Sequence, residues 1–270
     1  MSSKETSLFT KMVSKVGDNY LSEPWERKYY ADKYSCCPPP LFIPIVSLAQ
    51  VLLFILYFFD DNEVTFDGKR LSALGPVPTD SIIIFHPDKK AEIWRFFMYM
   101  FVHAGWVHLT FNLTVQVLIG LPLEMVHGSG RIAMIYLSGV IAGSLATSIF
   151  DPHTILVGAS GGIYALLTAH LANVLLNYHQ MQLGILRVVG VILVASADVG
   201  FAIYDRFSRD PSQPPVSFVS HVAGALSGLT IGLVVLKNFE QKLREQLVWW
   251  ICVGIYLSAL LFGILFNIIM

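Results

Sequence analysis

The stretch IAMIYLSGVIAGSLATSIF, residues 132–150, contains no lysine, arginine, aspartate or glutamate. A helix of this length is long enough to cross a hydrocarbon core of ~30 Å. Working outward, the same pattern recurs in six further windows. They are residues 41–59, 96–123, 152–186, 188–204, 216–236 and 247–270, and only the window 188–204 is interrupted, by Asp198. The sequence therefore predicts an all-α polytopic membrane helix bundle with seven spans.

The composition supports this class of protein and excludes others. Of the 270 residues, 54% are hydrophobic and 14% charged, whereas an ordinary soluble domain has roughly 45–50% and about 25%. The net charge of −1 provides no basic field for a nucleic acid. Three cysteines form neither a disulfide framework nor a zinc ligand set. We therefore expect no metal, no cofactor and no nucleic-acid partner.

The chain divides into a polar N-terminal segment, residues 1–40, and a membrane domain, residues 41–270. The segment lacks a cleavable signal pattern, so we expect the first span to act as a signal anchor. With the N-terminus in the cytoplasm, 11 of the 18 lysines and arginines lie in cytoplasmic segments, as the positive-inside rule favours. Five of the other seven lie in the long loop 60–95. An odd number of spans then places the C-terminus outside.

In this orientation, spans two, four and six all enter the membrane from the non-cytoplasmic side. Each carries polar residues near its start: His108 and Asn112 in span two, Ser160 in span four and His221 in span six. We expect these four side chains to meet at one depth.

Span two contains two histidines, for which we expect different roles. His108 and Asn112 are four residues apart and share a helix face, whereas His103 lies roughly opposite Asn112. We therefore expect His103 to be a hydrogen-bonded histidine at the mouth of the span. For His108 and Asn112 alone, an interhelical hydrogen bond and a functional role are equally plausible.

Span four begins with Gly158-Ala159-Ser160-Gly161-Gly162-Ile163-Tyr164. Glycines on both sides leave the Ser160 hydroxyl unshielded and allow a peptide backbone to approach. The unpaired N–H groups at a helix start can also face a developing oxyanion. Taken alone, the motif favours a packing face of small residues over a nucleophile site.

Span six carries His221 on its close-packing face. Gly224, Gly228 and Gly232 repeat every four residues on that face, which permits very close helix contact. Tyr164 lies one turn after Ser160, where its ring could stack on the imidazole. An ionisable side chain inside a membrane is by default a functional hypothesis, and Ser160 is its expected partner.

In this order, the motifs closely resemble the rhomboid family of intramembrane serine proteases. The resemblance runs from about Trp94 to Gly232, and one departure is Ser220, where many members have alanine. It implies six core helices within about residues 41–236, plus an extra C-terminal span, 247–270, as in secretory-pathway rhomboids of animals. The landmarks are Trp94-Arg95, His103-x4-His108-x3-Asn112, Gly120-x3-Glu124-x3-Gly128-Ser129, Gly158-x-Ser160-Gly161, Tyr164 and His221-x2-Gly224-x3-Gly228.

The resemblance also implies a role for each residue that matches a family motif. Ser160 would be the nucleophile and His221 the general base. The other implied roles are as follows: Asn112, His108 and Gly158 serve the oxyanion, Tyr164 packs on His221, Gly224 and Gly228 support helix contact, Trp94 and Arg95 belong to the long first loop, Glu124 is structural, and Ser144 and Ser148 help to hold water.

The activity implied is cleavage of single-span membrane proteins near the outer end of their transmembrane segments. Members resembling this chain release ectodomains, such as growth-factor precursors of the epidermal-growth-factor type. The lipid bilayer would be the second partner, and the location would be the secretory pathway: the endoplasmic reticulum, the Golgi or the plasma membrane. An inactive rhomboid that binds client helices is the main alternative, while a seven-span receptor and a proton-coupled transporter are less favoured.

Asp198 is the only formal charge inside a predicted span. The resemblance implies a Ser-His dyad, in which Tyr164 rather than an acid orients the imidazole. We therefore expect Asp198 to be protonated or hydrogen-bonded against another helix, and Asp198→Asn to keep at least a tenth of the activity.

Overall fold

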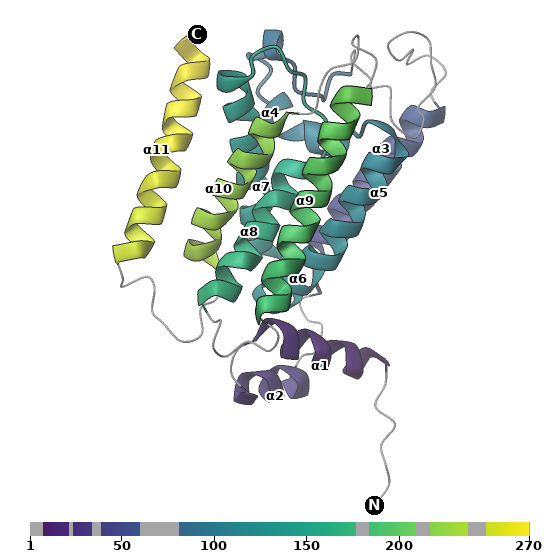
Figure 1. The fold of residues 1–270 in the computed structure, drawn as a ribbon, viewed down its shortest axis with the longest axis vertical. Helices are drawn as coiled ribbons and strands as arrows, with labels where there is room; N and C mark the ends of the chain where they lie inside the picture. Colours follow the sequence, from purple (N-terminus) through teal and green to yellow (C-terminus); the bar gives the residue numbers. More distant parts are fainter. Residues whose placement is uncertain are drawn as a thin grey trace, which may run out of the picture.

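The computed structural model describes residues 8–21, 24–33, 39–59, 81–176, 184–208, 217–236 and 247–269. In these ranges the chain is helical apart from connecting segments and one isolated β-bridge between Phe85 and Leu156. The bundle helices lie side by side, with α1 and α2 beneath one end and the last residues of α11 at the opposite end (Figure 1). The elements are α1 (Leu8–Tyr20), α2 (Pro24–Lys33), α3 (Phe42–Phe59), η2 (Pro87–Lys89), α4 (Arg95–Met98), η3 (Tyr99–Phe101), α5 (Gly105–Val115), η4 (Gln116–Gly120), α6 (Leu121–His127), α7 (Ser129–Phe150), α8 (Ser160–Leu176), α9 (Gly184–Ser208), α10 (Phe218–Val235) and α11 (Leu247–Ile269).

A helix occupies each of the seven predicted windows, and four helical stretches in the described residues are long and apolar enough to cross a membrane. These are 105–127, 129–150, 218–235 and 247–269. The apolar part of α3, 42–57, is shorter, and α8 has only 17 residues. The all-α polytopic membrane fold is confirmed.

Span two begins later than its charge-free window predicts. The stretch Arg95–Phe101 forms the short helices α4 and η3, and the spanning helix begins at Gly105, whose φ is +82°. From there α5, a π-helical turn (η4) and α6 continue to His127. The prediction of residue 96 as the start is wrong, because a window that counts only charges merges a span with apolar helices beside it.

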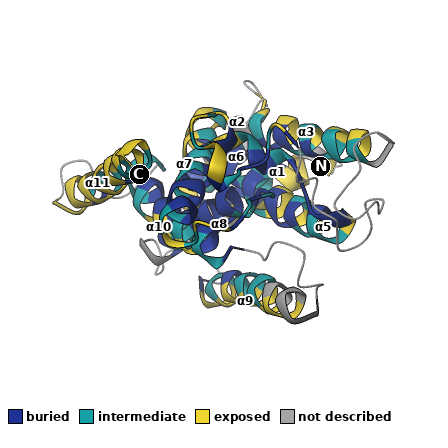
Figure 2. Cartoon of the chain, turned by 90° about the horizontal axis from the view of Figure 1, so that it is seen from above, coloured by how far each residue is buried: buried dark blue, intermediate teal, exposed yellow. Residues whose placement is uncertain are grey.

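Helix α8 lies at the centre of the bundle, and most of its residues are buried (Figure 2). Its contact with α10 follows the predicted glycine face. A Cβ added at Gly224 would lie 2.3 Å from the Gly161 carbonyl oxygen, and one at Gly228 would lie 2.1 Å from that of Ala165. Two helices approach this closely only where side chains are absent, so the glycines set the separation of α8 and α10.

Glu124, in α6 at the end of span two, holds neighbouring helices together. Its carboxylate accepts hydrogen bonds from the backbone amides of Phe42 (2.6 Å) and Ile43 (2.9 Å) and from the Ser129 hydroxyl (2.5 Å). A carboxylate at a helix start satisfies amides that have no intrahelical acceptor. Glu124 thus ties α6 to the first turns of α3 and α7, a structural contact as expected.

The polar N-terminal segment contains two helices that the hydropathy pattern did not indicate. Val16 and Leu21 pack in a small apolar cluster with Val126 at the end of α6. The Arg27 side chain of α2 donates to the Leu21 carbonyl (2.9 Å). This segment therefore docks on the end of span two (Figure 1).

Candidate active site

Ser160 is the first residue of α8, directly after a tightly turned loop. Gly158 has a φ of +102°, a conformation that L side chains rarely adopt, and its amide donates to the Tyr99 carbonyl (3.1 Å). Because Ser160 opens the helix, the first amides of α8 have no acceptor within the helix. The local chain thus places a hydroxyl beside the first amide groups of a helix.

His221 lies in the first turn of α10, whose N-cap is Ser217. Its imidazole is buried and stacked on the Tyr164 ring, with centroids 4.6 Å apart and planes 18° from parallel. The expected stacking is therefore present. It fixes the plane of the imidazole but leaves rotation within that plane to other contacts.

The glycine contact brings His221 and Ser160 to the same end of the α8–α10 pair. Gly224 lies against Gly161, which directly follows Ser160. His221 is one turn before Gly224 on α10, so the imidazole and the hydroxyl lie on the same side of this contact.

His108 lies over the glycine turn. A Cβ built on Gly158 would lie 2.6 Å from His108 Cε1. The ring therefore occupies the space that only a glycine leaves open, beside the start of α8. The structure brings these two predicted oxyanion residues together.

Asn112 is buried one turn further along α5, and its side-chain amide donates to the His108 carbonyl (3.0 Å). An amide NH₂ has two donors, so one remains for another acceptor. This bond tethers Asn112 to the backbone of its own helix and sets the direction of the second N–H.

The expectation of a hydrogen-bonded His103 is wrong. Its ring is buried, neither nitrogen has a hydrogen-bond partner in the described residues, and it packs edge-on against His108 with centroids 5.3 Å apart. Our prediction placed His103 and Asn112 on one continuous helix, but the turn before Gly105 separates His103 from that helix. It borders the candidate site as the neighbour of His108.

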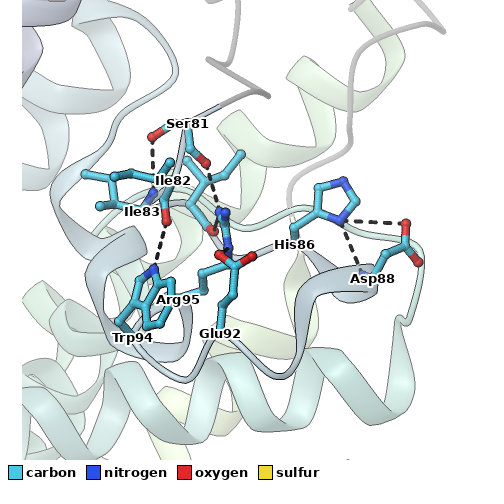
Figure 3. Close-up of polar contacts among 9 residues, drawn as sticks. Ser81, Ile82, Ile83, His86, Asp88, Glu92, Trp94 and Arg95 are labelled. Atoms are coloured by element: carbon cyan, nitrogen blue, oxygen red, sulfur yellow. Dashed lines mark hydrogen bonds and ion pairs between the residues drawn. The ribbon is translucent and has the colours of Figure 1, made fainter.

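Trp94 and Arg95 anchor the segment that precedes α4 (Figure 3). The Arg95 guanidinium donates to the carbonyls of Ser81 (2.8 Å) and Ile84 (2.9 Å) and pairs with Glu92 (2.7 Å). The Trp94 indole donates to the Ile82 carbonyl (3.0 Å).

This anchored segment reaches the candidate site through the backbone. Phe85 exchanges two hydrogen bonds with Leu156, at 3.2 and 3.1 Å, four residues before Ser160. Trp94 and Arg95 therefore support the Ser160 loop from a distance.

Tyr99 is a supporting residue that sequence reasoning missed. It is almost fully buried, and its hydroxyl donates to the Val140 carbonyl (2.8 Å) while its carbonyl accepts from Gly158. Both the Tyr99 hydroxyl and the Ser220 hydroxyl border Gly143. A tyrosine within an apolar run carries no periodic signal, so only the packing shows this role.

Ser144 and Ser148 are both engaged in contacts within the protein. Ser144 is fully buried, and its hydroxyl donates to the Phe96 carbonyl (2.7 Å). The Ser148 hydroxyl donates to the side chain of Asn267 on α11. These contacts connect α7 to α4 and α11.

Asp198 faces another helix, as expected, but the group that it faces is His221. Its Oδ2 lies 3.4 Å from His221 Nδ1. Within the described part of the chain, no group of three or more histidine, cysteine, aspartate or glutamate side chains is arranged to hold a metal ion.

A family model described as the Rhomboid domain matches residues 90–238, which include every predicted site residue. The chain is 41% identical to human Rhomboid-related protein 3 over 269 residues, covering 98% of this chain and 65% of that protein. It is 43% identical to mouse Rhomboid-related protein 2 over 244 residues, 90% of this chain and 79% of that protein. The chain belongs to the rhomboid family and is an integral membrane protein.

The family also includes a relative named as inactive. The chain is 31% identical to Inactive rhomboid-related protein 2 of Caenorhabditis elegans over 237 residues, 88% of this chain and 65% of that protein. The chain thus spans about two-thirds of the length of several relatives that it matches.

Proposed function

We propose that this protein is an intramembrane serine endopeptidase that uses a Ser160–His221 dyad. The observation that carries the proposal is the arrangement around His221. Its imidazole is stacked on Tyr164, and the next turn of α10 lies against Gly161, the neighbour of Ser160. This arrangement supports the proposal that the His221 imidazole acts as the base for the Ser160 hydroxyl.

In the proposed reaction, Ser160 Oγ attacks the scissile carbonyl carbon while its proton passes to His221. The carbonyl oxygen then carries the negative charge of the tetrahedral intermediate. The Ser160 amide, the second N–H of Asn112 and the His108 ring beside Gly158 serve as its donors. Removing one such donor costs about 10²–10³ in rate in a related mechanism.

Collapse of the intermediate breaks the carbon–nitrogen bond, and His221 returns the proton to the leaving amine. A water molecule then gives a proton to His221 and its oxygen to the acyl carbon. Breakdown of the second intermediate releases the carboxylic acid and restores the Ser160 hydroxyl. Apart from one water molecule, both half-reactions use only the protein groups named above.

The substrates we propose are single-span membrane proteins, cut near the outer end of the transmembrane helix. Ser160, His108 and His221 all lie near the starts of helices that begin at the end of the bundle opposite α1 (Figure 1). Growth-factor precursors of the epidermal-growth-factor type are the proposed class, released in the secretory pathway. In this proposal the N-terminus lies in the cytoplasm.

A serine-hydrolase probe tests the activity directly. A fluorophosphonate should label the wild-type protein in detergent, and Ser160→Ala should abolish that labelling. Ser160→Ala and His221→Ala should each reduce release of a co-expressed ectodomain to below ~1% of wild type, while the protein accumulates in membranes. If the wild-type protein is folded but the fluorophosphonate does not label it, the alternative is favoured, an inactive rhomboid that binds client helices.

A further inference from the structure

A buried carboxylate from α9 lies against the imidazole of α10. Asp198 Oδ2 is 3.4 Å from His221 Nδ1, and the two side chains are only 13% and 7% exposed. Neither atom has a hydrogen-bond partner in the described residues, and the pair itself is at ion-pair distance without full hydrogen-bond geometry.

The position of Asp198 along its helix makes this contact notable. It lies eleven residues after Arg187 near the start of α9, or about 16 Å along the axis at 1.5 Å per residue. A carboxyl group at such a depth is costly unless it has a partner. Isoleucine, leucine and valine side chains of α9 are exposed elsewhere, as expected for a helix facing lipid.

The same face of α9 also contacts Tyr164. The Tyr164 hydroxyl donates to the Ala195 carbonyl (3.3 Å), one turn before Asp198. Tyr164 therefore covers the face of the imidazole, while Asp198 lies at its Nδ1 edge. Stacking fixes the plane of a ring, and a contact at its edge fixes the rotation within that plane.

We infer that Asp198 is a positioning residue, which holds the Nδ1 edge of His221 so that Nε2 serves as the base. This inference rests on the proposed Ser160–His221 chemistry. When Nε2 takes the Ser160 proton, Nδ1–H remains a donor toward the carboxylate, which stabilises the imidazolium without receiving the proton. Asp198 does not touch the substrate.

The expected effect follows from the geometry. Loss of the acid costs about 10⁴ in the serine-protease template, where it forms a full hydrogen bond and is the main orienting group. Here the distance is longer, and Tyr164 also orients the ring. We expect Asp198→Asn to lower kcat about 10- to 100-fold with KM nearly unchanged, a larger loss than the sequence alone predicts.

The test uses purified full-length protein in proteoliposomes with a single-span membrane substrate. Asp198→Asn keeps the size of the side chain and removes its charge. Ser196→Ala, at an exposed position two residues earlier on α9, is the matched control. The readouts are kcat, KM, the rate of fluorophosphonate labelling and the thermal midpoint. If the asparagine variant does not accumulate, Asp198→Ser carries the same test.

The inference is supported if Asp198→Asn lowers kcat and the labelling rate while its KM and thermal midpoint stay near wild type. Ser196→Ala should be unaffected on all of these measures. Unchanged kcat in Asp198→Asn overturns the inference, as does a loss matched by a fall in thermal midpoint or by Ser196→Ala. Failure of the wild-type protein to cleave or to be labelled would instead refute the proposed function itself, so the two failures are distinguishable.

Discussion

Adding one methyl group at Gly228 should separate α10 from α8 and displace His221. An alanine Cβ at this position would lie 2.1, 2.3 and 2.5 Å from the O, Cα and C atoms of Ala165. These are backbone atoms, which cannot rotate away as a side chain can. Ordinary contact begins at 3.4 Å, so α10 must move locally by about 1.3 Å, the difference between 3.4 and 2.1 Å.

The displacement reaches the candidate site because His221 lies two turns from Gly228 on the same helix. A misplacement of about 1 Å can cost roughly 10²-fold in rate. Overpacking typically lowers the free energy of unfolding by about 1–3 kcal/mol. We therefore expect Gly228→Ala to lower kcat about 100-fold while most of the protein remains folded, and Gly228→Val to be worse on both measures.

The assay compares substrate cleavage in proteoliposomes with the thermal midpoint in detergent. Gly254→Ala on α11 is the matched control, because a Cβ there meets nothing within 4 Å. This control should retain wild-type cleavage. If Gly228→Ala cleaves normally with an unchanged thermal midpoint, the close contact between α8 and α10 does not position His221.

Three further predictions concern other parts of the site and its support. Asn112→Ala should slow cleavage about 10²-fold to 10³-fold, or less if other donors compensate. Thr114→Ala, at an exposed position on the same helix, should not slow it. Equal cleavage rates for the two variants would make Asn112 a packing residue. Gly158→Ala should abolish cleavage and fluorophosphonate labelling, because its Cβ would lie 2.6 Å from His108 Cε1 at a φ of +102°; normal labelling would refute this crowding. Glu124→Ala should lower the free energy of unfolding by about 1–3 kcal/mol, because it removes the acceptor of the partly buried Phe42 amide and the buried Ile43 amide. We expect kcat of the folded fraction to be unchanged, and a wild-type value in chemical denaturation would contradict this prediction.

The sequence anticipated much of the helical architecture because hydrophobic length is a local property. A helix occupies each of the seven charge-free windows, whereas α1 and α2 lie outside them and were not predicted. The same criterion failed at residues 96–104, where apolar side chains belong to short helices and a turn. Counting charges cannot detect the positive φ of Gly105, after which the spanning helix begins.

Inside the bundle, the periodicity of the sequence predicted which face of a helix packs closely, but not which residues of a neighbouring helix it contacts. The glycine repeat of α10 indicated close packing, and the structure has it against Gly161 and Ala165. Gln116, one turn after Asn112, is fully buried and donates to Ser47 (2.8 Å) and Gln50 (3.0 Å), contacts that spacing within one helix does not predict.

The sequence by itself determined that this chain forms a bundle of apolar helices, and its motifs placed a serine, histidines and an asparagine near the starts of three of them. Those properties follow from composition and from spacing within one helix. Only the tertiary structure decided that Asp198 faces His221 and that Tyr99 supports the loop before Ser160. Such pairings depend on the rotation and separation of neighbouring helices, and these are set by contacts between residues far apart in the chain.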